Sequence, residues 1–219
     1  MQTDALTGMY ASAWVARGVL GLVGLLGLVR YRTLAPALRY LVALVWFGLL
    51  LEATGELLHH WHLPNLLLSP VDAAGEVWLL SWVYAWALES ARFSRWRPWV
   101  AGGFVLYAAA SSGLAPEMAR FQPGVLVLNC LLVLGMAGLY FRKMLHELRA
   151  PRPTGDPMFW VSAGWLVYAM GKLLVALCSN YALTHYSREL NLWMWAGVNG
   201  LALVLYLCYG RALWIRPQR

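Results

Sequence analysis

Residues 36–59 read PALRYLVALVWFGLLLEATGELLH, and this stretch decides the fold class. Its length matches the roughly 20 residues with which a helix crosses a hydrocarbon core of about 30 Å. It lacks the strict alternation of apolar and polar residues that is typical of an outer-membrane barrel strand. The stretch therefore predicts a membrane-spanning helix, and this helix carries two carboxylates, Glu52 and Glu56, near its far end.

Comparable apolar stretches fill most of the chain. Hydrophobic residues make up 61% of the 219 positions and charged residues 12%, against roughly 45–50% and about 25% in a soluble domain. We therefore predict an all-α membrane protein that forms a single seven-transmembrane-helix bundle in the lipid bilayer. The predicted spans are 11–29, 36–59, 70–90, 98–114, 122–144, 157–182 and 190–213.

The basic residues of the connections predict the orientation, because cytoplasmic loops carry an excess of Lys and Arg. One side of the predicted bundle carries Arg30, Arg32, Arg39, Arg92, Arg95, Arg97, Arg142, Lys143, Arg149, Arg152, Arg211, Arg216 and Arg219. The connections on the other side carry only Arg120 and Arg188. We predict an inner (cytoplasmic) membrane protein with its N-terminus outside and its C-terminus cytoplasmic. The net charge of +7 is then a topology signal, so we expect no nucleic-acid partner.

Two short sequences predict where helices begin. In Ser69-Pro70 and Asp156-Pro157, a capping residue precedes a proline at the first helical position. Asp72 then falls in a first turn, where a carboxylate stabilises the helix dipole. We expect that role for Asp72 rather than ligand binding.

Charged residues inside the predicted spans indicate a polar site. Each costs at least about 2.5–3.5 kcal/mol near the bilayer centre, so it needs a partner or a water-filled cavity. At 1.5 Å per residue, Arg17, Glu52 and Glu76 lie about 9–10 Å from the outer ends of their spans. Lys172, in the sixth span, lies between the midplane and the outer third. These residues therefore meet in the outer half of the predicted bundle.

Amide and aromatic side chains occupy the same outer half. We predict a polar, aromatic-lined cavity there that binds an unknown small molecule, with Arg17 and Lys172 countering some of the carboxylates. The predicted ligand-binding residues are Arg17, Glu52, Glu56, Glu76, Asn129, Trp165, Tyr168, Lys172, Asn180, Trp195 and Asn199. The alternative is that the glutamates are neutral, or only pair with the cations and fix helix register.

A histidine cluster suggests a metal site as a weaker hypothesis. Glu56 and His60 stand at the i and i+4 spacing of a helical metal pair, and His59 and Glu76 would complete the set. Histidines at a membrane boundary are more typical of interfacial residues, like the adjacent Trp61. The chain has no HExxH motif and no second HxxxH. We expect no bound metal and no cofactor.

Three functions are compatible with these residues. The favoured one is a receptor-like sensor that binds a small ligand and signals through a separate partner, because the polar groups lie on one side and no effector domain fits in the chain. A small-solute or ion transporter would use Glu52, Glu56, Glu76 and Lys172, but needs a route through the inner half as well. A membrane-embedded metal-dependent hydrolase would need at least three protein ligands around the metal. The absence of GxSxG, Walker and GxGxxG motifs argues against an enzyme.

Several segments resemble an uncharacterised family of bacterial seven-helix membrane proteins. They are the segments around Glu52 to Glu56, Asn65 to Glu76, and Asp156-Pro157-Met158-Phe159-Trp160 through Gly164, Tyr168 and Ser179-Asn180-Tyr181. The resemblance covers nearly the whole chain, and it implies a sensory role with a sensor histidine kinase as partner. Lys172 stands where the family is expected to have a small residue. The layout is also similar to that of rhodopsin-type receptors, in topology only, because the chain lacks DRY, NPxxY and a lysine in the last span.

Overall fold

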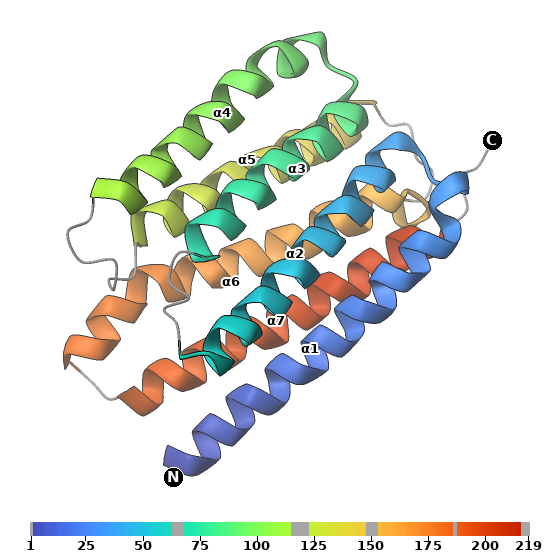
Figure 1. The fold of residues 1–219 in the computed structure, drawn as a ribbon. Coiled ribbons are helices and arrows are strands. Elements are labelled where there is room, and N and C mark those ends of the chain that lie inside the picture. The colour runs from blue at the N-terminus through green and yellow to red at the C-terminus, as the bar shows by residue number, and fades with distance from the viewer. Residues whose placement is uncertain (1, 63–67, 115–122, 148–152, 186–187, 216–219) are drawn as a thin grey trace.

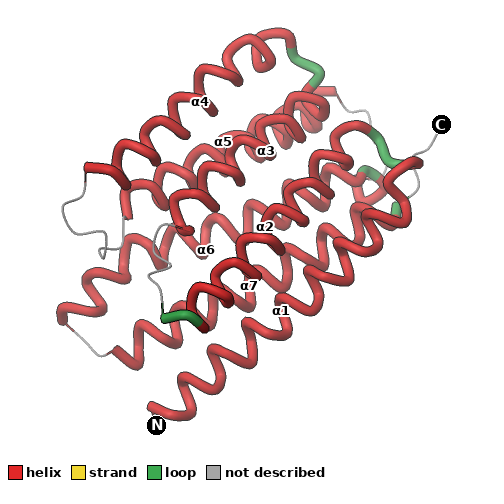
Figure 2. The backbone as a smooth tube through the Cα atoms, viewed as in Figure 1, coloured by secondary structure: helices red, strands yellow, loops and turns green. Residues whose placement is uncertain are grey.

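The computed structural model describes residues 2–62, 68–114, 123–147, 153–185 and 188–215. Within these residues the chain forms seven α-helices and two single-turn 3-10 helices, at 31–33 and 153–155. The α-helices are α1 (Gln2–Arg30), α2 (Pro36–His60), α3 (Leu68–Leu88), α4 (Ala91–Leu114), α5 (Pro123–Glu147), α6 (Pro157–His185) and α7 (Arg188–Trp214). Figure 2 shows the described residues almost entirely as helix, with a short loop between α3 and α4. The predicted all-α fold is confirmed for the described part of the chain.

The helices run side by side in one bundle, with the N-terminus at one end and the C-terminus at the other (Figure 1). Around the bundle α1 packs on α2, α2 on α3, α3 on α5, α5 on α6, α6 on α7 and α7 on α1. These six helices therefore close a ring. The remaining helix, α4, lies outside the ring and packs mainly on α3.

Five of the helices are long and apolar enough to cross a membrane, namely α1, α2, α5, α6 and α7. Their outward faces suit contact with lipid, since large apolar side chains such as Leu22, Leu25, Val29 and Leu174 are exposed. The chain thus has the fold of an all-α membrane protein. Charged residues interrupt α3 and α4, which pack alongside the other helices.

Two predicted helix starts have different outcomes. The start of α6 at Pro157 is confirmed, and the Oδ1 atom of Asp156 accepts a hydrogen bond from the backbone N–H of Met158 at 2.9 Å. The predicted start of α3 is wrong. This helix already includes Leu68, so Ser69 lies inside it and is not its N-cap.

The start of α4 also differs from the prediction at residue 98. The helix begins at Ala91, and Pro98 lies inside it. The hydroxyl oxygen of Ser90 accepts a hydrogen bond from the backbone N–H of Phe93 at 3.4 Å, as an N-cap residue does. The arginines that precede Pro98 therefore lie in the first turns of a helix rather than in a connection.

One end of the bundle, which we call the basic end, is where α1, α3, α5 and α7 finish and α2, α4 and α6 begin. Here the Nη1 atom of Arg30 donates to the carbonyl oxygens of Leu213 and Trp214, at 2.6 Å each. These bonds satisfy carbonyl groups at the end of α7 that have no partner in their own helix. They also hold the ends of α1 and α7 together.

The half of the bundle next to the basic end is closely packed. Leu38, Leu41, Tyr84, Val161 and Leu213 come from four helices, and each is at most 2% exposed. They belong to one continuous core cluster of apolar side chains. The interior of this half is therefore filled with side chains.

Candidate functional site

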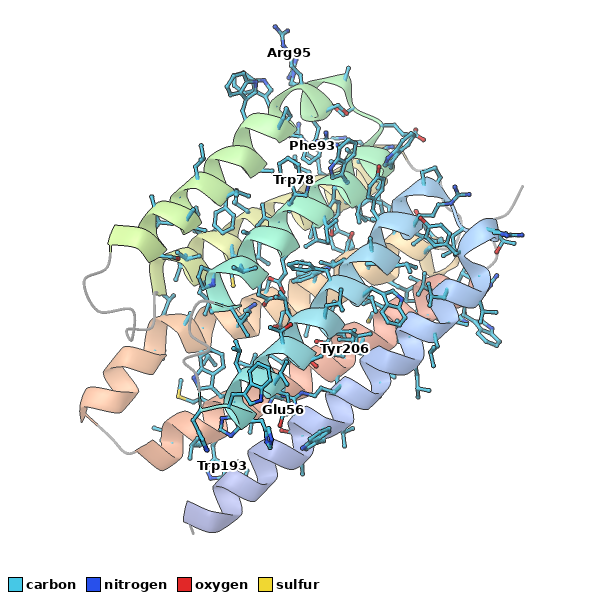
Figure 3. The ribbon with its side chains drawn as sticks, viewed as in Figure 1. Glu56, Trp78, Phe93, Arg95, Trp193 and Tyr206 are labelled. Carbon is cyan, nitrogen blue, oxygen red and sulfur yellow. The ribbon has the colours of Figure 1, made fainter. Side chains whose placement is uncertain are left out.

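The other half of the ring encloses a cavity of about 400 Å³. Helices α1, α2, α3, α6 and α7 supply nearly all of its wall, and Leu126 adds a contact from α5. Its charged lining residues are Arg17, Glu52, Asp72, Glu76 and Lys172, and its aromatic ones are Phe47, Trp165, Tyr168, Trp195, Tyr206 and Tyr209. Figure 3 shows the labelled Tyr206 in this interior and Glu56 on α2 nearby. Arg17, Glu52 and Glu76, which the sequence predicts at a similar depth in the membrane, thus line the same cavity.

Glu76 is the centre of a three-helix cluster. Its Oε2 atom accepts a hydrogen bond from the side-chain amide of Asn129 on α5 at 2.7 Å and lies 3.5 Å from the Nζ atom of Lys172 on α6. The side chains of Lys172 and Glu76 are only 10% and 13% exposed. An ammonium group at that depth needs an opposite charge and hydrogen bonds to stay ionised. The predicted counter-charge role of Lys172 is therefore present in the geometry.

A second ion-pair cluster joins α1 and α2. The Nε atom of Arg17 lies 3.4 Å from the Oε2 atom of Glu52, and its Nη1 atom donates to the Oε2 atom of Glu56 at 3.0 Å. The Arg17 guanidinium also lies 5.1 Å from the ring centroid of Trp14, a cation–π distance. These side chains are more exposed than the Glu76 cluster. Glu56 pairs with Arg17 but lies off the cavity wall.

Asp72 differs from the other carboxylates. It lies one helical turn before Glu76 on the same face of α3, and it lines the cavity. Its carboxylate has no hydrogen-bond or ion-pair partner among the residues the structure describes. Because α3 includes Leu68, Asp72 is not in the first turn, and the predicted helix-dipole role is wrong. The i, i+4 spacing to Glu76 was the sequence signal that could have placed it in the site.

Aromatic side chains connect the cavity to the packed half. The ring of Trp165 lies 5.6 Å from that of Tyr168 and 6.4 Å from that of Tyr209, centroid to centroid. Trp165 is 3% exposed, and its indole N–H has no hydrogen-bond acceptor in the described part of the chain. Tyr206 and Tyr209 were not predicted as site residues, although their i, i+3 spacing puts them near one face of α7.

The remaining predicted site residues have mixed placements. Trp195 and Asn199 line the cavity from α7, and the Nδ2 atom of Asn199 donates to the hydroxyl of Ser12 at 3.4 Å. Asn129 is buried behind the wall, in contact with Glu76. The side chain of Asn180 lies outside the described residues.

The structure does not bring the hypothetical metal ligands together. Glu56, His59 and His60 are exposed on α2, whereas Glu76 contacts Lys172 and Asn129 inside the ring. No group of three or more His, Cys, Asp or Glu side chains is placed to hold a metal ion within the ranges that the structure describes. The predicted ligand set for a metal-dependent hydrolase is therefore not assembled.

Comparisons with known proteins leave the site to be interpreted on its own geometry. No protein-family model matches the chain. No curated protein matches it. No solved structure matches it either. The cavity and its side chains are therefore the features from which a function can be inferred.

Proposed function

We propose that the protein is a receptor-like membrane protein that binds a small ligand in this cavity and signals through a separate cytoplasmic or membrane partner, such as a sensor kinase. The observation that supports the proposal is the cavity itself. Its volume of about 400 Å³ is within the range of about 300–1,000 Å³ typical of small-molecule pockets. Charged side chains from four helices line it, and charged groups inside a bundle typically mark ligand or ion sites.

The proposal includes a topology. We propose that all seven helices cross the inner membrane, since α3, with 21 residues, is about 30 Å long at 1.5 Å per residue. The basic end would face the cytoplasm, because positively charged residues accumulate on that side of membrane proteins. The N-terminus would lie outside and the cavity in the outer half of the bilayer.

The packed half of the bundle favours binding over transport. A transporter must open its site alternately to both sides. Between the cavity and the basic end, Leu41, Tyr84, Val161 and Leu213 are at most marginally exposed, so the residues that the structure describes leave no open route for a solute to the basic end. A site that is closed on one side suits a receptor better.

The packing of α7 supports a path for the proposed signal. Tyr209 lines the cavity and belongs to the same core cluster as Ala212 and Leu213, near the end of α7. A ligand that displaces Trp165 or Tyr209 would favour one arrangement of α6 and α7 over another. Such a differential contact is what ligand-driven conformational change requires.

The test is a metabolite screen by thermal unfolding of the purified protein in detergent. We expect a ligand that raises the unfolding midpoint of the wild type and of Glu89→Gln, a variant at the basic end, by the same amount, and that gives a different shift in Lys172→Met or Glu76→Gln. Each shift is measured against the same variant without ligand, so a lower starting stability does not confuse the result. Shifts that are unchanged in both cavity variants would contradict the proposal. Uptake of the same ligand into proteoliposomes would favour the transporter instead.

A further inference from the structure

The charges on the cavity wall do not balance. The wall carries two cations, Arg17 and Lys172, and three carboxylates, Glu52, Asp72 and Glu76. Arg17 lies 3.4 Å from Glu52 and Lys172 lies 3.5 Å from Glu76, so each cation has a carboxylate. Asp72 has no cation at ion-pair distance in the described ranges, and Lys172, which attracts it from farther away, is already paired with Glu76. One carboxylate of the wall is thus left to pair with a positive charge brought by the ligand.

The rest of the wall suits an organic cation better than a bare metal ion. The rings of Trp165, Tyr168, Trp195 and Tyr206 line the same cavity, and aromatic faces attract ammonium groups. The structure already contains one such contact, because the Nζ atom of Lys172 lies 5.2 Å from the ring centroid of Tyr168. A space of about 400 Å³ is also much larger than a single metal ion needs.

A second polar group points to a hydrogen-bond acceptor on the same ligand. Trp165 lines the cavity, and its indole N–H is fully buried at the edge of the wall with no acceptor among the described residues, so a small displacement of the ring by a ligand would bring the N–H to an acceptor on that ligand. Buried donors are nearly always paired, and each exception calls for an explanation. Trp165 and Asp72 come from different helices, α6 and α3, so the two observations are independent of each other.

Taking the proposed function of the cavity as its starting point, we infer that the ligand is a small organic cation, an amine or quaternary ammonium compound that also carries a hydrogen-bond acceptor. Its positive charge pairs with Asp72 among the aromatic rings. Its acceptor, a carbonyl, ester or carboxylate oxygen, accepts the hydrogen bond from the indole of Trp165. A zwitterion with this arrangement belongs to the same class.

Calorimetric titration with three matched probes tests the inference. They are acetylcholine, with both groups, tetramethylammonium, with only the charge, and 3,3-dimethylbutyl acetate, the neutral isostere of acetylcholine. The protein is placed in nanodiscs of phosphatidylglycerol, which has no amine in its headgroup, and empty nanodiscs give the background. We expect acetylcholine to bind most tightly and the neutral isostere at least tenfold more weakly.

Variants locate the binding. Asp72→Asn should weaken the binding of acetylcholine at least tenfold. Trp165→Phe should reduce the difference in affinity between acetylcholine and tetramethylammonium. Glu89→Gln, whose carboxylate lies at the basic end, should bind as the wild type does. Because Asp72 has no partner in the described part of the chain, Asp72→Asn should fold, and its thermal unfolding midpoint checks this.

Three results would overturn the inference. They are equal binding of the neutral isostere, acetylcholine binding that is unchanged in Asp72→Asn, and no binding of either cation up to millimolar concentration. An acidic ligand from the metabolite screen that depends on Lys172 would also overturn the inference but would leave the proposed function standing. If the screen finds no ligand that depends on Lys172 or Glu76, the proposed function fails as well.

Discussion

Replacing Lys172 with methionine should destabilise the protein strongly, because Asn129 is then the one remaining partner of the Glu76 carboxylate among the described residues. At 3.5 Å, the attraction between the two charges is about 5 kcal/mol for an effective dielectric constant of about 20. Removing one partner of a buried pair typically costs about 3–5 kcal/mol. The remaining carboxyl group can bind a proton instead of staying charged, which limits the loss. We therefore expect a decrease of about 3 kcal/mol in the free energy of unfolding.

The double variant Lys172→Met/Glu76→Gln should recover much of this loss. It leaves no unpaired charge at positions 76 and 172, and a glutamine at position 76 keeps an oxygen that accepts from Asn129. The loss of unfolding free energy in the double variant should thus be smaller than the sum of the two single losses by at least about 2 kcal/mol. Such a coupling energy is within the range seen for residues of one network. Titration with sodium dodecyl sulfate in mixed micelles, followed by circular dichroism, measures the four free energies.

The ion pair between Lys143 and Glu89 provides a matched control. It has a similar N–O distance, 3.6 Å, but the side chain of Glu89 is 71% exposed. Exposed pairs contribute about 0–1 kcal/mol, so Glu89→Gln should change stability by less than about 1 kcal/mol. If the effects of Lys172→Met and Glu76→Gln simply add, the two side chains do not interact and the cavity wall has been assigned wrongly.

Three further predictions concern packing and topology. A Cβ atom added in Gly27→Ala would lie 2.7 Å from a methyl group of Val42, and the substitution should cost about 1–3 kcal/mol of stability. A Cβ atom added in Gly18→Ala meets nothing within 4 Å, so this substitution should instead raise stability by up to about 1 kcal/mol, because alanine favours the helix over glycine. Detergent titration of both variants distinguishes them, and equal effects would contradict the α1–α2 packing. Tyr84→Phe removes a buried hydrogen bond of 3.1 Å to Ser162 and should cost about 1 kcal/mol in the same assay, so a neutral result would argue against that bond. A C-terminal fusion to green fluorescent protein should fluoresce and a C-terminal fusion to alkaline phosphatase should be inactive, and the opposite pattern would reverse the proposed orientation.

Helix content and depth were the predictable parts of this structure. Long apolar stretches separated by basic clusters predict helices because a bilayer requires the backbone to satisfy its own hydrogen bonds. The constant rise per residue then placed Arg17, Glu52 and Glu76 at one level before any packing was known. In the structure those three residues line one cavity, as their similar depth in the membrane predicted.

The order of helices around the bundle was not predictable in the same way. Hydropathy does not say that α4 lies outside the ring, because that depends on which faces of α3 and α5 meet. The predicted span of 98–114 begins too late, because the Ser90 cap of α4 lies eight positions before residue 98. Local signals of helix initiation compete with each other, and packing decides between them.

The role of Asp72 distinguishes two explanations of the charged residues in the cavity, a ligand-binding site and a purely structural network. The pairs that Arg17 and Lys172 form would be explained equally well if the charges only fixed the register of the helices, a role known for buried polar groups. Register alone gives no role to a carboxylate that forms no hydrogen bond or close ion pair in the described part of the chain. If Asp72 serves a ligand, Asp72→Asn should leave the free energy of unfolding of the ligand-free protein unchanged within about 0.5 kcal/mol, or raise it, because functional sites are often kept at a cost in stability. A loss as large as that of Lys172→Met in the same detergent titration would instead make Asp72 part of the structural network, and the case for a ligand cation would lose its main support.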